Sequence, residues 1–167
     1  MKLPIVILIL ASFNAVAGEA EVCKGNKGAR SFLSEWREGG RVSDILTTVQ
    51  GAEILRERGR IAYQADLNGD GNQDYIFESF DSQGSAIDRT FGIFVQCRGF
   101  LQFMGGNYFA SVEEIGSKNN GYHDVTFLSY QRDESDEVIY AKKGQALTKS
   151  HVWSFNPSSG KYEGGMD

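Results

Sequence analysis

Beyond Arg60, the sequence consists of short aromatic and β-branched runs separated by clusters of Gly, Asn, Asp and Ser. Alternation between compact apolar runs and turn-forming residues is typical of strands that are joined by tight turns. Strands are predicted at residues 61–65, 75–79, 91–97, 100–104, 125–130, 138–140 and 152–155. This part of the chain should therefore form a mainly antiparallel, meandering β-sheet.

Two segments before Arg60 carry helical spacing instead. In residues 31–40, three apolar side chains recur at helical spacing before a double glycine, namely Phe32, Leu33 and Trp36. Residues 43–59 begin at Ser43, a candidate N-cap, and end at Gly59. Their apolar stripe consists of Ile45, Val49, Ala52 and Leu55. The sequence thus predicts an α+β fold, with two short N-terminal helices packed on the mainly antiparallel, meandering β-sheet.

The N-terminus has the features of a secretory signal peptide. Lys2 precedes an apolar run at residues 3–10, and the small residues Ala15 and Ala17 form a candidate cleavage site. The run is too short to span a bilayer comfortably. We therefore expect a signal peptide at residues 1–17 and a single exported domain at residues 18–167. The protein would be periplasmic or secreted, with no membrane span.

Export bears on the two cysteines, Cys23 and Cys97, because an oxidising compartment favours their pairing. A disulfide between them is expected, and two buried free thiols are the alternative, since a sequence does not fix the distance between residues.

The balance of acidic and basic residues limits the kinds of partner that the protein can bind. With 22 acidic and 17 basic residues, the net charge of −5 argues against nucleic acid or an anionic membrane.

The stretch "DLNGDGNQD" at residues 66–74 contains the pattern D-x-N-x-D-G-x-x-D. Its oxygen-bearing side chains belong to Asp66, Asn68, Asp70 and Asp74, and Asn72 would add a backbone carbonyl. Gly69 and Gly71 allow the backbone to wind tightly around a common centre. Hard oxygen donors without nitrogen or sulfur favour calcium over magnesium, which demands stricter geometry. The alternative is an Asp/Asn-rich turn without metal, because these residues dominate turns.

This spacing resembles the calcium loops of EF-hands, dockerin modules, and FG-GAP and VCBS repeats. An EF-hand would place a glutamate on a helix at position twelve, whereas Phe77 stands here and both flanks look like strands. The resemblance is therefore to the FG-GAP and VCBS type, and it covers residues 61–79. It implies a calcium ion held by Asp66, Asn68, Asp70 and Asp74. One copy does not make a propeller, so that fold is not implied.

The usual catalytic motifs are absent from the sequence, and its histidines, His123 and His151, have no evident nucleophile beside them. An acidic cluster, Asp133, Glu134, Asp136 and Glu137, is either a solvated hairpin loop or a face for a basic partner. With no catalytic residues assigned, the sequence favours a calcium-binding module whose partner is another protein. By analogy with small exported bacterial proteins, it would be an inhibitor or immunity protein against a cell-envelope-attacking enzyme. The alternative is a periplasmic hydrolase with an Asp/Glu site that the sequence does not place.

Overall fold

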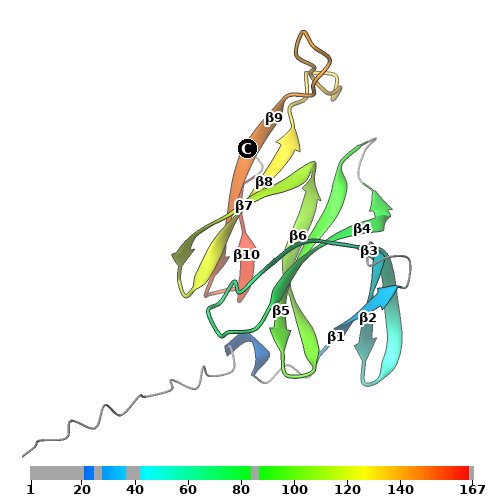
Figure 1. Cartoon of the computed structure of the whole chain (residues 1–167), viewed down its shortest axis with the longest axis vertical. Coiled ribbons are helices and arrows are strands. Elements are labelled where there is room, and N and C mark those ends of the chain that lie inside the picture. Colours follow the sequence, from blue (N-terminus) through cyan, green and yellow to red (C-terminus); the bar gives the residue numbers. More distant parts are fainter. Residues whose placement is uncertain (1–20, 25–27, 37–41, 84–86, 166–167) are drawn as a thin grey trace, which may run out of the picture.

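The computed structural model describes residues 21–24, 28–36, 42–83 and 87–165. The predicted signal peptide lies outside this part of the chain. Regular structure within it consists of the 3-10 turn η1 (Glu21–Cys23) and ten strands (Figure 1). The strands are β1 (Arg30–Trp36), β2 (Val42–Val49), β3 (Ala52–Ala65), β4 (Asp74–Gln83), β5 (Arg89–Cys97), β6 (Phe100–Phe109), β7 (Ser111–Asn119), β8 (Tyr122–Tyr130), β9 (Thr148–Asn156) and β10 (Lys161–Glu163).

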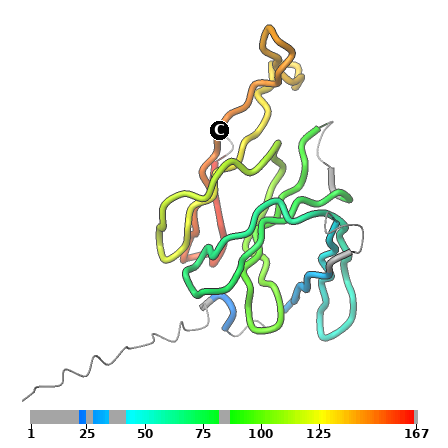
Figure 2. Tube along the Cα trace, in the orientation of Figure 1, coloured from blue at the N-terminus to red at the C-terminus, as the bar shows by residue number. Residues whose placement is uncertain are grey.

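The strands form two antiparallel units. Strands β1 to β6 close into a barrel in sequence order, and a four-stranded sheet follows with the order β10-β9-β8-β7. The barrel closes through a short contact, because β1 pairs with β6 only at Ser31 and Leu101 in the described residues. Figure 2 shows the four-stranded sheet beside the barrel, and the connection between β8 and β9 extends away from both. No helix among the described residues is long and apolar enough to cross a membrane.

The two predicted N-terminal helices are wrong, because their residues form strands β1, β2 and β3. Residues 37–40 of the first predicted helix lie outside the described residues. In the second, Gln50 and Gly51 have φ angles of 51° and 84° and form the two-residue turn between β2 and β3. Such left-handed pairs are the usual turns of tight hairpins. The pairing of β2 with β1 on one side and with β3 on the other replaces the helical hydrogen bonds.

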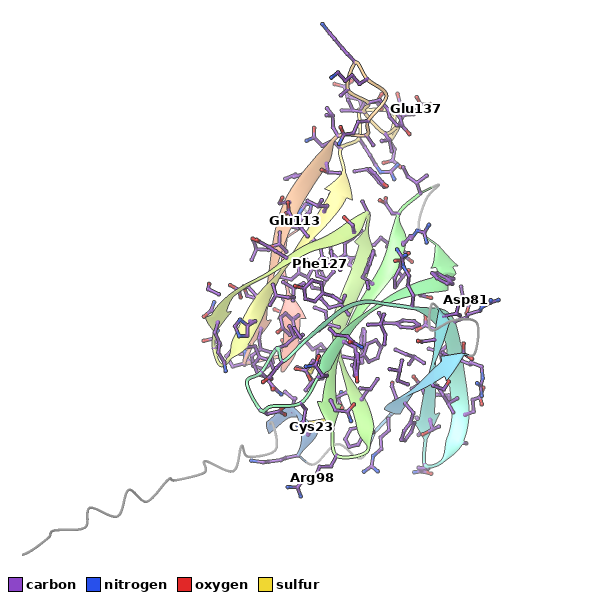
Figure 3. The ribbon with its side chains drawn as sticks, viewed as in Figure 1. Cys23, Asp81, Arg98, Glu113, Phe127 and Glu137 are labelled. Carbon is purple, nitrogen blue, oxygen red and sulfur yellow. A yellow bond between two sulfur atoms is a disulfide. The ribbon has the colours of Figure 1, made fainter. Side chains whose placement is uncertain are left out.

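The main apolar core lies between the barrel and the four-stranded sheet. Phe109 from β6 stacks on Phe127 from β8 with ring centroids 4.2 Å apart, and neither side chain is exposed. Trp153 from β9 meets both rings edge-on. Figure 3 labels Phe127 at this junction. A smaller cluster, Ile45, Phe77, Phe94 and Leu101, fills part of the barrel interior. The barrel and the sheet therefore bury their apolar faces against each other.

Candidate metal centre

The segment 66–74 connects β3 to β4, so it is flanked by strands on both sides. Gly69 and Gly71 have φ angles of 77° and 86°, in the left-handed region that favours glycine. A Cβ atom at Gly71 would meet no atom within 4 Å, so the backbone conformation alone requires glycine there. The loop thus winds tightly at both glycines that the sequence singles out.

The carboxylate of Asp66 is turned inward onto the loop backbone. Its Oδ1 accepts the N–H groups of Gly69 at 2.7 Å and Asp70 at 3.1 Å, and its Oδ2 accepts the N–H of Gly71 at 2.9 Å. These bonds hold the first carboxylate of the pattern at the centre of the loop. They also shape the backbone that carries the later positions.

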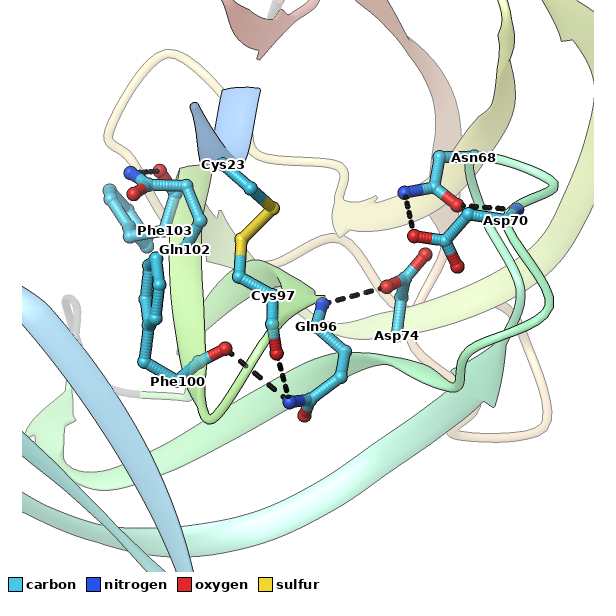
Figure 4. The surroundings of a disulfide bond; sticks show 9 residues. All are labelled: Cys23, Asn68, Asp70, Asp74, Gln96, Cys97, Phe100, Gln102 and Phe103. Atoms are coloured by element: carbon cyan, nitrogen blue, oxygen red, sulfur yellow. Dashed lines mark hydrogen bonds between the residues drawn. A yellow bond between two sulfur atoms is a disulfide. The ribbon is translucent and has the colours of Figure 1, made fainter. Parts of the chain in front are cut away.

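Asn68 and Asp70 complete the inner lining of the loop. The Asn68 Oδ1 accepts the N–H of Asp70 at 2.9 Å, and the Asp70 Oδ1 accepts the N–H of Asn72 at 2.8 Å. The Asn68 side-chain amide also donates to Asp70 Oδ2 at 3.1 Å (Figure 4). Asn72 itself is exposed. The structure therefore brings together the first three oxygen-bearing side chains of the pattern.

Asp74 lies beneath the loop and is fully buried. Its Oδ2 accepts the N–H of Leu67 and its Oδ1 accepts the N–H of Gln96, both at 2.8 Å. The pKa of Asp74 is raised to about 6, because burial, together with the negative charges of Asp70 and Asp66, outweighs the lowering effect of its two backbone hydrogen bonds. The three carboxylates are thus close enough for their charges to repel one another.

Within the described residues, no group of three or more His, Cys, Asp or Glu side chains is arranged to hold a metal ion. The predicted ligands depart from such a group in two ways. Asn68 contributes an amide, and both oxygens of Asp66 and both oxygens of Asp74 are engaged by backbone N–H groups. A cation in this loop would therefore depend on amide and backbone oxygens as well as carboxylates, as calcium does in proteins.

The loop is also attached to the second sheet through contacts that the sequence did not indicate. The backbone N–H of His123, in β8, donates to the Leu67 carbonyl at 2.7 Å. The Lys118 Nζ, in β7, donates to the Asn68 carbonyl at 2.9 Å. Because 50 residues separate Asn68 from Lys118, no local spacing in the sequence reveals this contact. The ammonium group of Lys118 thereby adds a positive charge at the rim of the loop.

The predicted disulfide is confirmed. Cys23 and Cys97 are bonded, with Cα atoms 5.6 Å apart, and both are buried. The bond ties η1 to the end of β5. Gln96, the residue before Cys97, donates its backbone N–H to Asp74 (Figure 4). The disulfide and the candidate metal loop are therefore attached to adjacent residues of one strand.

The four acids of the predicted acidic cluster are all exposed, on the excursion between β8 and β9, where Figure 3 labels Glu137. Asp133 Oδ1 accepts the N–H groups of Ser135 at 2.8 Å and Glu137 at 3.0 Å. Arg132 anchors the base of the excursion through an ion pair of 2.6 Å with Asp88. The acids therefore protrude into solvent from a loop that its own hydrogen bonds shape.

The two histidines occupy different surroundings. His123 Nδ1 lies 2.9 Å from the Gly116 carbonyl oxygen. His151 is buried, with 6% of its surface exposed. Its Nε2 lies 2.6 Å from Ser129 Oγ, and its Nδ1 lies 3.0 Å from the Gly165 carbonyl oxygen. Ser129 and His151 are thus a hydroxyl and imidazole pair without a carboxylate on the second ring nitrogen.

Comparison with protein-family models, with curated proteins and with solved structures found no match to this chain. The site is therefore interpreted from its own residues and geometry.

Proposed function

We propose that this protein is an exported calcium-binding protein that acts by binding another molecule. The observation that carries the proposal is the loop between β3 and β4, whose Asp66, Asn68 and Asp70 side chains all turn inward above buried Asp74. These residues, together with the Asn72 carbonyl, would hold the ion. Calcium takes roughly six to eight oxygen ligands and accepts irregular geometry, which suits a mixed set of this kind.

The charges around the loop support a divalent ion. Asp66, Asp70 and Asp74 supply three carboxylates, and the Lys118 ammonium at the rim offsets one of them. Two negative charges then remain to be balanced. When bound, calcium supplies a fixed double positive charge at this point and relieves the repulsion among the carboxylates.

The contacts of the loop support a structural effect of the ion. Leu67 and Asn68 connect the loop to β8 and β7, and Asp74 connects it to β5 next to the disulfide. An ion that ordered the loop would strengthen the attachment of the barrel to the four-stranded sheet. Since calcium would bind to the folded loop and not to the unfolded chain, its binding should also stabilise the fold.

Asp70→Ala is expected to abolish calcium binding, because it removes the carboxylate at the fifth position of the pattern. Calorimetry on the wild-type protein should show one calcium site, and chelator should lower its melting temperature. The variant should show no heat of binding and no response to chelator. A wild-type melting temperature that is unchanged by chelator, with no heat of calcium binding, would identify the loop as a turn.

Lys118→Met provides a matched control with the opposite sign. Methionine keeps an unbranched side chain of similar length, and the substitution removes the positive charge that lies next to the Asn68 carbonyl. Calcium affinity should rise by roughly three- to tenfold, the effect of one charge near a hydrated protein surface. An unchanged affinity would show that the ion, if it binds, does not occupy this loop.

The second part of the proposal is a protein partner, such as a cell-envelope-attacking enzyme that this protein inhibits. The protruding position of the four acids, Asp133, Glu134, Asp136 and Glu137, supports it, because a protruding charged face suits recognition better than catalysis. The alternative is a hydrolase, for which the sequence suggested an Asp/Glu site. The hydrogen bond between Ser129 and His151 supports a hydroxyl nucleophile in its place. The hydrolase ranks second because His151 is buried and faces a backbone carbonyl in place of an orienting carboxylate.

Replacing the four acids by Asn or Gln is expected to slow association with a basic partner and to weaken its salt dependence. Screening acts over about 8 Å at physiological ionic strength, so exposed charges mainly affect the rate of encounter. The measurement is the association rate with a partner identified by pull-down from a periplasmic extract, at low and high salt. Equal rates for the variant and the wild type would exclude the acids from the interface.

The hydrolase alternative is tested separately with the purified protein. Hydrolysis of an ester or of peptidoglycan that the Ser129→Ala substitution abolishes would favour it.

A further inference from the structure

A cleft of about 240 Å³ opens where the outer face of the barrel meets the junction between β6 and β7. Its walls belong to β3, β4 and β5 on one side and to residues 110–112 on the other, and these elements can be followed in Figure 1. Ile61, Phe91 and Val112 give it apolar surface, and Ser111 adds a hydroxyl group. The cleft lies outside the metal loop and the acidic excursion.

Glu78 and Arg60 line the cleft, and a second arginine, Arg89, is outside the lining but binds the same carboxylate. Glu78, on β4, is 1% exposed. Its Oε2 accepts a hydrogen bond of 2.5 Å from the Nε of Arg60, on β3. Its Oε1 accepts a hydrogen bond of 2.6 Å from the Nη1 of Arg89, on β5. Arg60 pairs directly with Glu78 in the β3–β4 register. One carboxylate thus positions two guanidinium groups, one from each neighbouring strand.

The two arginines retain capacity for a ligand. Each guanidinium has five N–H donors and uses one on Glu78, and the others have no partner among the residues that the structure describes. Both side chains are about half exposed, at 56% for Arg60 and 50% for Arg89. The three groups together carry one net positive charge, in a chain whose net charge is −5. Glu78 and its two arginines therefore form a locally positive cluster at the cleft, within an acidic protein.

We infer that this cleft binds a small amphipathic carboxylate, with its charged group on Arg60 and Arg89 and its apolar part against Ile61, Phe91 and Val112. Guanidinium groups match the two oxygens of a carboxylate, and adjacent apolar walls favour an organic acid over a fully hydrated inorganic anion. The cleft has room for a group the size of one amino-acid side chain. The C-terminal residue of a peptide and a free short-chain acid share this chemistry.

The probe is isovalerate, and its neutral counterpart isovaleramide is the matched control ligand. Isovalerate should produce saturable amide shifts at residues 110–112 in a two-dimensional NMR titration, and isovaleramide should not. An acetylated tripeptide that ends in leucine, compared with its C-terminal amide, distinguishes a peptide terminus from a free acid. Equal shifts with isovalerate and isovaleramide, or equal binding of inorganic phosphate, would overturn the inference.

Two substitutions in the cleft have opposite expected effects. Arg89→Gln should weaken isovalerate binding by roughly tenfold, because it removes charged donors from the site. Glu78→Gln should strengthen binding by roughly three- to tenfold, because it removes the internal anion that competes for the same arginines. Arg98→Gln is the control, because Arg98 lies in the turn between β5 and β6, at the opposite end of β5 from Arg89. Figure 3 labels Arg98 there. Equal weakening by Arg89→Gln and Arg98→Gln would contradict the assignment.

The test is independent of the calcium proposal, because the cleft and the metal loop share no residues. Titrations with and without calcium should give the same isovalerate affinity. If a variant in the cleft fails to fold, the comparison of isovalerate with isovaleramide on the wild-type protein still decides the inference.

Discussion

Replacing Cys23 and Cys97 together by alanine is expected to lower the free energy of unfolding by about 4 kcal/mol. The disulfide closes a loop with a sequence separation of 74, and closing so long a loop removes much of the conformational freedom of the unfolded chain. In the folded protein it attaches η1, which contributes Cys23 and part-buried Val22 to the main core. Denaturant unfolding of the variant and of the oxidised wild type measures the difference.

The reduced wild-type protein separates this effect from that of the substitutions themselves. Reduction should produce most of the same loss, because it opens the loop without changing the side chains. A loss below about 1 kcal/mol in both proteins would show that the unfolded chain stays compact without the bond. Calcium binding by the double variant should persist in a folded sample, since the candidate ligands are held by their own hydrogen bonds.

Much of the sheet could be predicted because its strands carry strong local signals. In β5, Phe91, Ile93 and Val95 alternate toward the main core, and the apolar residues of β4 and β8 are similarly dense. β7 was missed because it has only two apolar residues, Val112 and Ile115, and it lies over the barrel through few of its side chains. Apolar density predicts a strand only where that strand covers the core.

The N-terminal strands were mistaken for helices because the barrel interior is partly polar there. Inward-facing positions on β1 and β2 include Ser31, Ser43 and Thr47, and Ser31 and Thr47 hydrogen-bond to each other at 2.9 Å. Polar residues on the inner face remove the alternation that identifies a strand. Gly59 was interpreted as a helix terminator, but a Cβ atom there would collide with the Phe77 ring and the Glu78 carbonyl oxygen. Glycine is required at this position because it allows β3 and β4 to approach each other closely.

The candidate sites differ in how far local sequence describes them. The spacing in residues 66–74 predicted a wound loop between strands, with Asp66 turned to its centre, because all its parts are near in sequence. It did not predict that Asp74 binds the backbone of Gln96, which comes from another strand. The cleft around Glu78 was not predicted at all. The two arginines that bind Glu78 lie on β3 and β5, on either side of β4, and the opposite wall of the cleft comes from the β6–β7 junction.

Phe127→Ala is expected to lower the free energy of unfolding by about 3–5 kcal/mol, because it opens a cavity between the barrel and the four-stranded sheet. Phe127 is fully buried and contacts the rings of Phe91, Phe109 and Trp153, so its removal takes partners from β5, β6 and β9 at once. Phe127→Leu, which keeps most of the volume, should cost about 1.5 kcal/mol or less. Chemical denaturation of the three proteins gives the comparison.

The same variants test whether the two sheets unfold as one unit. A core shared by the barrel and the sheet should unfold in a single transition, with the same midpoint by far-UV circular dichroism and by tryptophan fluorescence. The chain has two tryptophans, so a Trp36→Phe background leaves Trp153 as the reporter of the shared core. If Phe127→Ala shifts the fluorescence midpoint and leaves the circular dichroism midpoint in place, the barrel is stable without the sheet. The metal loop, which bonds to both β5 and β8, would then be a connection between two separately stable units.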